Sequence, residues 1–220
     1  MILRQLERVS RTTGIDRLIV ATSTDPSDDR LAEICTQEGI ACFRGQLDDV
    51  LDRFYQAALP YRPDHVIRLT ADCPLADPAL IDRLVDFFLE RGDDYASNCL
   101  EPTYPDGLDA EIFRFSCLEQ AWQEASLTSH REHVTPFMYQ NPGRFRIGCL
   151  KNDSDLSSLR WTVDEPSDFE LIRRIYECLY PQNPCFTTQD ILALLDRAPE
   201  LTAINAGITR NEGFLKSLSG

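Results

Sequence analysis

Short apolar runs alternate along the first half of the chain with segments that have the residue period of an amphipathic helix. The pattern predicts strands over residues 17–22, 40–43, 65–70 and 94–98, separated by helices over 28–39, 48–58 and 78–90. Strands that alternate with helices are typical of a mostly parallel sheet with helices on its faces. We therefore expect an α/β fold.

The second half of the chain breaks this rhythm. Proline, glycine and acidic residues fill 99–110 and lead into a short strand at 111–113. Beyond it the pattern predicts helices over 116–125, 131–140, 166–179 and 188–195, strands over 144–150 and 159–163, and a polar C-terminal tail. The chain itself opens inside an amphipathic helix, with no strand in front of it, whose apolar face is formed by Ile2, Leu3, Leu6 and Val9.

Composition fits one folded domain of 220 residues, since 43% of the residues are hydrophobic and 26% are charged. The net charge of −14 disfavours nucleic acid and anionic membranes as partners. The eight cysteines form no CxxC pair and no cluster with histidine at metal-ligand spacing, which argues against zinc. Reduced cysteines, with no signal peptide and no apolar run near the ~20 residues of a membrane span, indicate a soluble cytoplasmic protein.

Carboxylates follow two of the predicted strands. Asp72 comes after the strand over 65–70, Asp164 comes directly after the strand over 159–163, and each precedes a proline-led helix. Ligands of open α/β sheets bind outside the carboxyl ends of the strands, and Mg²⁺ commonly uses one or two carboxylates together with substrate phosphates. The two aspartates could therefore hold one Mg²⁺ between them. Taken singly, each has the alternative role of a helix or turn cap.

Two further groups of residues have the chemistry of a binding site. Arg44 follows a strand, and the glycine after it allows a phosphate or ribose to approach the backbone, although a surface turn is the alternative. Irregular backbone further along carries groups that suit a polyhydroxy ligand: Asn98, Asp106, Gly107, Asp109, Glu111, Arg131 and His133. The alternative there is ordinary turn chemistry for Pro-Asp-Gly and a satisfied helix histidine.

Six motifs occur in a fixed order along the chain. They are Val-Ala-Thr-Ser (20–23), Phe-Arg-Gly (43–45) with Asp-Val-Leu-Asp-Arg (49–53), Arg-Leu-Thr-Ala-Asp-Cys-Pro-Leu-Ala-Asp-Pro (68–78), Tyr-Pro-Asp-Gly-Leu-Asp-Ala-Glu (104–111), Arg-Glu-His-Val-Thr-Pro (131–136) and Leu-Arg-Trp-Thr-Val-Asp-Glu-Pro-Ser-Asp-Phe (159–169). Across residues 1 to about 180 the chain resembles the spore-coat-polysaccharide type of cytidylyltransferase, which is related to the acylneuraminate and 3-deoxy-manno-octulosonate cytidylyltransferases.

This resemblance implies a glycosyltransferase-A-like, Rossmann-like three-layer sandwich over 1–180, with a helical extension over 181–220 packed on the same domain. It implies transfer of CMP from CTP to a sugar, often an acidic one, with release of pyrophosphate, in surface-polysaccharide biosynthesis. By position, the resemblance matches Asp72 and Asp164 to the residues that hold Mg²⁺. It matches Arg44, Thr70 and Asp72 to residues that contact the nucleotide. The seven residues between 98 and 133 that are named above fall where relatives bind the sugar. A homodimer formed through a segment near 100–150 is also expected.

The sequence departs from the family pattern at its beginning. Relatives begin with a strand and an Ala-Arg-x-x-Ser-x-Arg-x-Pro-x-Lys loop that wraps the triphosphate, whereas this chain opens in the helix that follows that loop. We expect roughly 20–30 further residues that supply the missing first strand and basic loop, and low activity without them.

Two other functions remain open from the sequence. A non-catalytic sugar-binding or scaffold subunit would keep the sugar site and bind no CTP. A glycosyltransferase that uses a nucleotide-sugar would carry an Asp-x-Asp motif after a strand, which the segment Asp72–Asp77 does not supply.

Overall fold

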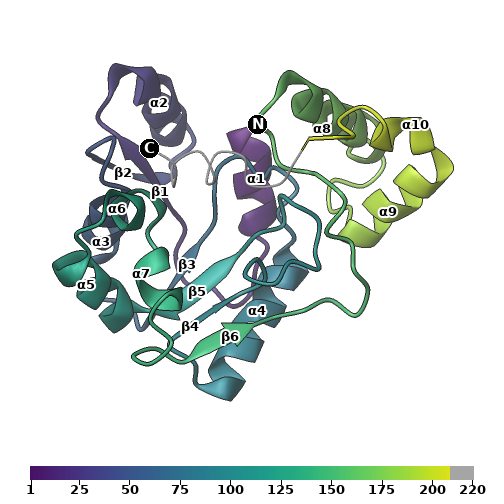
Figure 1. Ribbon diagram of the computed structural model, residues 1–220. Coiled ribbons are helices and arrows are strands. Elements are labelled where there is room, and N and C mark those ends of the chain that lie inside the picture. The colour runs from purple at the N-terminus through teal and green to yellow at the C-terminus, as the bar shows by residue number, and fades with distance from the viewer. Residues whose placement is uncertain (209–220) are drawn as a thin grey trace.

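The computed structural model describes residues 1–208 (Figure 1). Its strands are β1 (Ile19–Ser23), β2 (Ala41–Gly45), β3 (His65–Arg68), β4 (Tyr95–Ser97), β5 (Glu111–Arg114) and β6 (Ile147–Cys149). Its α-helices are α1 (Ile2–Val9), α2 (Asp29–Gln37), α3 (Val50–Ala58), α4 (Pro78–Arg91), α5 (Phe115–Glu124), α6 (Thr128–His133), α7 (Pro136–Tyr139), α8 (Pro166–Leu179), α9 (Thr188–Arg197) and α10 (Pro199–Thr202). A short 3₁₀ helix (Pro26–Asp28) precedes α2.

The strands of the described residues form two sheets. β1 and β2 pair in parallel, with Ile19 opposite Ala41. The other sheet has the order β3-β5-β4-β6, in which β5 runs antiparallel to both of its neighbours and β4 is parallel to β6. The α/β class is confirmed; the β1-β2 sheet is parallel, whereas the four-stranded sheet is mixed rather than mostly parallel. The reason is that β4 connects to β5 without a crossover helix, and a parallel neighbour requires such a crossover.

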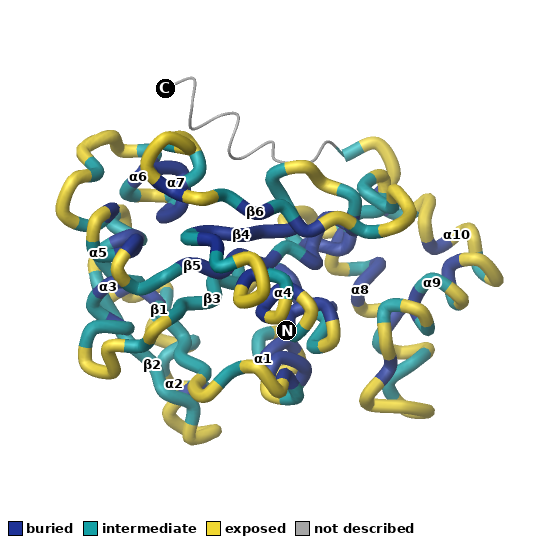
Figure 2. Tube along the Cα trace, turned by 90° about the horizontal axis from the view of Figure 1, so that it is seen from below, coloured by how far each residue is buried: buried dark blue, intermediate teal, exposed yellow. Residues whose placement is uncertain are grey.

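Helices cover both faces of the four-stranded sheet, as Figure 2 shows from below. Ile112 and Phe113, consecutive residues of β5, belong to different hydrophobic clusters because neighbouring side chains of a strand point to opposite faces. The cluster around Ile112 includes apolar residues of α4, α8 and α9, and the cluster around Phe113 includes those of α3, α5 and α7. The arrangement is a three-layer sandwich with the sheet in the middle.

The direction of the strands determines where polar groups can gather. Since β3, β4 and β6 all run opposite to β5, their carboxyl ends lie at the edge of the sheet where β5 begins. Asp72 follows β3, Asn98 follows β4 and Glu111 is the first residue of β5. The topology therefore brings these three predicted site residues to one edge.

The predicted strand over 159–163 is wrong. Its backbone makes a single bridge, Asp106 opposite Arg160, with hydrogen bonds from Asp106 N to Leu159 O (2.9 Å) and from Trp161 N to Asp106 O (2.6 Å). The partner of this segment is the irregular 104–108 loop, and a loop cannot supply a regular ladder. The predicted strand over 144–150 is likewise reduced to the three residues of β6.

The predicted single helix over 131–140 is two helices. Between α6 and α7, Val134 has φ +71° and ψ −58°, and Thr135 N donates to His133 O at 2.8 Å, which is the pattern of a γ-turn. Such a positive φ is rarely adopted by a β-branched residue. The turn stops the hydrogen-bond ladder of α6 and reverses the chain ahead of Pro136.

Helices α9 and α10 and the segment before them pack on the same core as the sheet, through Phe186, Ile191, Leu195 and Leu201. Arg8 of α1 reaches this segment, because its Nη1 donates to Phe186 O at 3.0 Å while its Nε donates to Ala76 O at 2.8 Å. The final part of the predicted polar tail, residues 209–220, lies outside the described residues. No helix of residues 1–208 has the length and apolar character needed to cross a membrane.

Candidate functional site

Asp72 lies in the turn between β3 and α4, at the carboxyl edge of the sheet, and is partly exposed. Its backbone oxygen accepts hydrogen bonds from Val163 N (2.9 Å) and Thr162 Oγ1 (3.4 Å). These bonds attach the turn after β3 to the segment that leads into Asp164. The two aspartates predicted to share a metal ion therefore belong to backbone segments that are hydrogen-bonded to each other.

Asp164 is exposed over 54% of its side chain, and its Oδ2 accepts a hydrogen bond from Arg160 Nη2 at 2.6 Å. Arg160 is itself only 9% exposed and also pairs with Asp106 (3.0 Å) and Asp168 (2.9 Å). Burial opposes the charge of this guanidinium, but the hydrogen bonds that it donates to Asp168 and Asp164 raise the pKa of Arg160 above its ordinary value. Arg160 therefore stays charged and holds three aspartates beside the site.

The oxygen donors at this edge have the chemistry that Mg²⁺ prefers, although they are few. Within residues 1–208, no group of three or more histidine, cysteine or acidic side chains is arranged to hold a metal ion. A site built from Asp72 and Asp164 would rely on substrate oxygens for its other ligands. One oxygen of Asp164 would have to be shared with Arg160.

Much of the loop predicted to bind a sugar is used to join segments of the protein. Asn98 is fully buried; its Nδ2 donates to Leu108 O and its Oδ1 accepts from Ala110 N, both at 2.8 Å. Gly107 has φ +100°, and a Cβ there would lie 2.4 Å from the backbone of Trp161 and Thr162. Asp106 is 7% exposed and is bound to Arg160. Of this loop, Asp109 is the acidic residue that remains partly exposed.

The predicted nucleotide contacts are partly occupied by internal bonds. Arg44 donates from Nε to Ser23 O (2.8 Å) and from Nη2 to Asp25 O (3.1 Å) and Asp29 Oδ1 (2.7 Å), so it closes the turn after β1. It also lines a hollow of about 420 Å³ beside α2. Thr70 lies beside the site, with its Oγ1 3.3 Å from the sulfur of Cys73.

Arg131 and His133 lie on α6, on either side of Glu132. Arg131 donates from Nη2 to Asp49 Oδ2 (2.6 Å) and from Nη1 to Trp122 O (2.8 Å), which ties α6 to the start of α3. His133 is partly buried, and this burial lowers its pKa. The partly buried ring of His133 therefore favours its neutral form.

Sequence reasoning missed an ion pair at the same edge. Arg68, the last residue of β3, donates from Nη1 to Glu111 Oε2 at 2.5 Å. Glu111 also accepts from Tyr95 OH at 2.6 Å and from Thr135 Oγ1 at 2.7 Å. A charged residue inside an apolar strand was the available signal, since a buried charge requires a partner.

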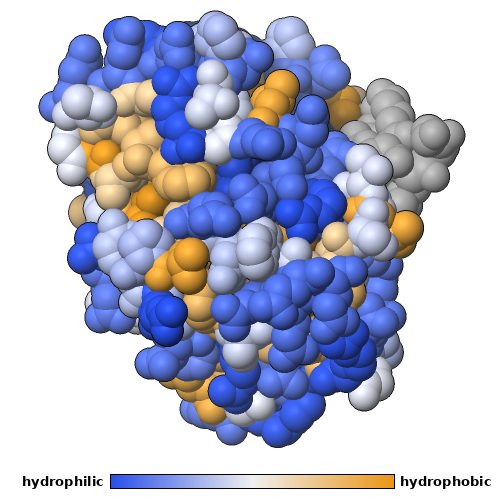
Figure 3. All heavy atoms as spheres, turned by 90° about the vertical axis from the view of Figure 1, so that its left-hand side faces the viewer, coloured by the Kyte–Doolittle hydropathy of each residue, from blue (hydrophilic) through white to orange (hydrophobic). Residues whose placement is uncertain are grey.

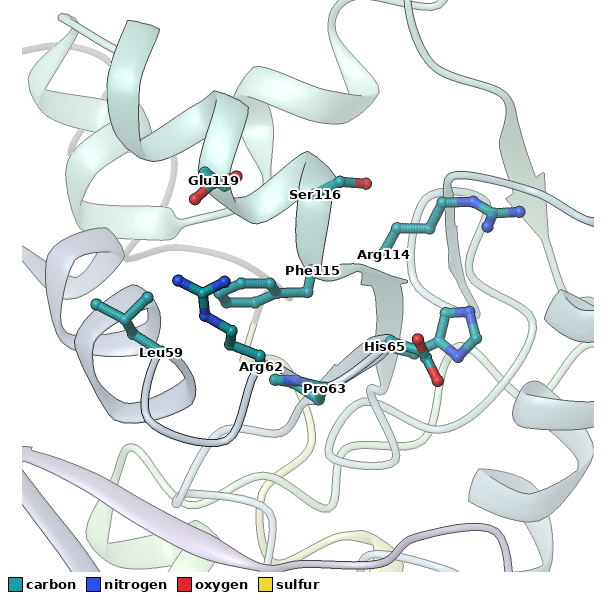
Figure 4. Close-up of a pocket in the computed structure, with 9 residues that line it drawn as sticks. Leu59, Arg62, Pro63, His65, Arg114, Phe115, Ser116 and Glu119 are labelled. Atoms are coloured by element: carbon teal, nitrogen blue, oxygen red, sulfur yellow. The ribbon is translucent and has the colours of Figure 1, made fainter.

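The hollow in Figure 4 lies at the opposite edge of the sheet. It has a volume of about 530 Å³ and is lined by residues next to the start of β3 and the end of β5, including Arg62, His65 and Arg114. None of the site residues predicted from the sequence lines this hollow. The candidate site is therefore the edge that carries Asp72, where the carboxyl ends of β3, β4 and β6 meet.

A family model for cytidylyltransferases matches residues 1–178, nearly the whole described fold. The chain belongs to the cytidylyltransferase family. Family membership supports nucleotidyltransferase activity in general terms, and the resemblance predicted from the six motifs is confirmed.

Two curated relatives cover most of the chain. It is 36% identical over 205 residues to the uncharacterized protein MJ1063 of Methanocaldococcus jannaschii, covering 92% of this chain and 82% of that one. It is 30% identical over 188 residues to the spore coat polysaccharide biosynthesis protein SpsF of Bacillus subtilis, covering 84% of this chain and 77% of that one.

Solved structures agree with this assignment. A cytidylyltransferase from Leptospira borgpetersenii matches with a TM-score of 0.87 and 30% identity, covering 95% of this chain and 87% of that one. A CMP-2-keto-3-deoxy-manno-octonic acid synthetase complexed with CTP matches with a TM-score of 0.59 and 15% identity, covering 80% of this chain and 87% of that one. At this identity the match shows a shared fold.

Proposed function

We propose that the protein transfers CMP from CTP to a sugar acid and releases pyrophosphate. The observation that carries this proposal is the hydrogen-bonded junction between the turn of Asp72 and the segment before Asp164, in a chain of the cytidylyltransferase family. The junction brings two carboxylate-bearing segments to the edge of the sheet where α/β folds bind ligands. The polysaccharide role named for SpsF and the CTP complex named for the synthetase support the choice of substrates.

In this reaction a hydroxyl oxygen of the sugar attacks the α-phosphorus of CTP. The new bond forms between that oxygen and phosphorus, the bond to the bridging oxygen breaks, and pyrophosphate leaves with the electron pair while the hydroxyl proton passes to solvent. Asp72 and Asp164 would hold Mg²⁺, which neutralises the charge that develops on the phosphates. Arg44 and Thr70 would contact the nucleotide.

The reaction is tested by incubating the protein with CTP, Mg²⁺ and a panel of sugar acids and measuring released pyrophosphate. Asp72→Asn and Asp164→Asn should each lower kcat by about 100-fold or more, because a lost metal ligand removes several kcal/mol of transition-state stabilisation.

Asp77→Asn is the matched control. Asp77 caps α4 by accepting from Ala79 N at 2.9 Å, and asparagine can accept the same bond, so its rate should stay near wild type. If no sugar acid of the panel supports pyrophosphate release, the proposal is contradicted. Sugar binding without CTP binding would instead indicate a sugar-binding subunit, and turnover of a ready-made nucleotide-sugar would indicate a glycosyltransferase.

A further inference from the structure

Arg68 forms a buried ion pair at the candidate site. It lies directly opposite Glu111 in the pairing of β3 with β5, and its side chain is 18% exposed while that of Glu111 is 7% exposed. Burial opposes the charge of the guanidinium, but the Glu111 carboxylate raises the pKa of Arg68 above its ordinary value. The guanidinium is therefore charged, and it lies on the more accessible side of the pair.

Glu111 is fixed on both of its oxygens. Oε2 accepts from Arg68, and Oε1 accepts from Tyr95 OH and from Thr135 Oγ1. Burial and the nearby carboxylate raise the pKa of Tyr95 well above its ordinary value, so the tyrosine keeps the proton that it donates. The carboxylate thus has no freedom to turn away, and the arginine that it binds is fixed with it.

The turn that delivers Thr135 is strained. Val134 holds its positive φ although it is β-branched and fully buried. Such a backbone is unfavourable for this residue and persists only where its surroundings enforce it. Here the turn sets the Thr135 hydroxyl on Glu111, so that the strain maintains the position of the ion pair.

The pairing of Arg68 is incomplete. A guanidinium has five N–H donors, and Nη1 of Arg68 makes its bond to Glu111. The Nε group is buried and has no hydrogen-bond partner within residues 1–208. Leaving a buried donor without a partner is costly, and a ligand oxygen that accepts from Nε itself would remove that cost.

We propose that Arg68 receives an anionic oxygen of the substrate, and that Glu111, Tyr95 and Thr135 are positioning residues for it. The proposal rests on the proposed function and concerns the same site, since Arg68 ends the strand that delivers Asp72. The anion is either the carboxylate of the sugar acid or a phosphate of the nucleotide. Arginine suits both because its planar N–H groups match two oxygens of one anion.

The test follows the Nε–Hε signal of Arg68 by ¹⁵N NMR during separate titrations with D-gluconate and with CMP. The signal is assigned by its loss in Arg68→Lys. A shift with gluconate identifies a carboxylate as the ligand, and a shift with CMP identifies a phosphate. If neither probe moves the signal, Arg68 is a structural ion pair and the proposal is overturned.

Affinity measured by isothermal titration calorimetry gives a second readout, which does not need the Arg68 signal. Arg68→Lys keeps the charge but loses donors, so the Kd of the shifting probe should rise about 10-fold, equivalent to about 1.4 kcal/mol. Thr135→Val should raise it about 3-fold, and Thr135→Ser should restore it. Arg114→Lys, the same change in a residue paired with Asp94 at 3.1 Å, should leave it unchanged. Unchanged affinity in Arg68→Lys would also overturn the proposal.

These readouts do not depend on turnover. Pyrophosphate release decides the proposed function, whereas the Arg68 signal decides whether this arginine binds an anion. A protein that binds gluconate at Arg68 but releases no pyrophosphate would retain the anion site and lose the transferase assignment.

Discussion

Asp168 has the most completely satisfied carboxylate that the structure describes beside the candidate site. It is fully buried, it accepts from Arg160 Nε (3.0 Å) and Nη2 (2.9 Å), and it accepts from Asn205 Nδ2 at 2.8 Å. It also accepts from the backbone N–H of Glu165 at 3.0 Å, at the start of α8. One side chain therefore joins α8, Arg160 and the last described segment of the chain.

The pKa of Asp168 makes the stability of this junction depend on pH. Burial alone would raise its pKa, but the hydrogen bonds from Arg160 and Asn205 hold the pKa of Asp168 below its ordinary value. A carboxylate with a depressed pKa in the folded state adds stability above its unfolded pKa of about 3.9 and loses it as the pH falls through the folded value. The stabilisation is therefore complete at neutral pH.

Asp168→Asn should lower the free energy of unfolding at pH 7 by about 3–5 kcal/mol, because it leaves part of a buried arginine uncompensated. It should also flatten the fall in stability below about pH 4. Urea denaturation between pH 3 and pH 7 measures both effects. Glu170→Gln, in the same helix but in surface ion pairs, should cost at most about 1 kcal/mol. An acid limb as steep as that of wild type would contradict this account.

The sequence identifies polar groups but not their partners, and this limits prediction of the site. Asp72 and Asp164 could be selected because each follows an apolar run, and the structure joins their segments. The sequence predicts that Asn98 and Gly107 bind substrate; in the structure Asn98 also bonds the backbone of residues 108 and 110, and Gly107 lies against the backbone of residues 161 and 162. Arg68 was overlooked because its partner Glu111 lies 43 residues further on.

At the scale of elements, predictions were best where the signal is local. Helix α8 begins at Pro166 and ends at Leu179 as predicted, because a proline and a capping box at Glu165 mark its start. The strands predicted from the sequence are longer than those in the structure, because a strand ends where its partner strand ends and a local pattern does not identify that partner. The 159–163 segment shows this clearly, because its partner is the loop around Gly107.

Gly107→Ala tests the junction between that loop and the 159–163 segment. A Cβ would lie 2.4 Å from backbone atoms of Trp161 and Thr162, and backbone cannot move aside as a flexible side chain can. The expected loss is about 2–4 kcal/mol of unfolding free energy, combining overpacking with an unfavourable φ.

Gly39→Ala provides the matched control for this change. Gly39 also has a positive φ, of +68°, but a Cβ there meets nothing within 4 Å, so only the conformational cost of about 1–2 kcal/mol remains. Thermal and urea unfolding compare the two variants. Equal losses would show that the close approach at Gly107 is relieved by small backbone shifts.

The whole molecule carries its net charge of −14 on a surface that is largely hydrophilic on the face shown in Figure 3. Several arginines are already bound to acidic partners, as in the pairs Arg160–Asp168 and Arg68–Glu111. A polyanionic ligand would therefore approach against a repulsive field, and the like charges on the folded protein repel one another. Both effects weaken when salt screens the surface charges.

Removing exposed negative charges should therefore stabilise the protein at low salt. Asp16, Asp48 and Asp153 lie exposed in loops, and changing all three to asparagine removes three negative charges. We expect the triple variant to melt about 2–4 °C above wild type in ~10 mM salt, equivalent to about 1 kcal/mol. In ~150 mM salt the difference should shrink, because the Debye length falls from about 30 Å to about 8 Å. Calorimetry at both salt concentrations measures the difference in melting temperature. The control changes the same three aspartates to glutamate, which keeps their charge. A difference in melting temperature that does not depend on salt would indicate that local contacts, rather than the net charge, cause it.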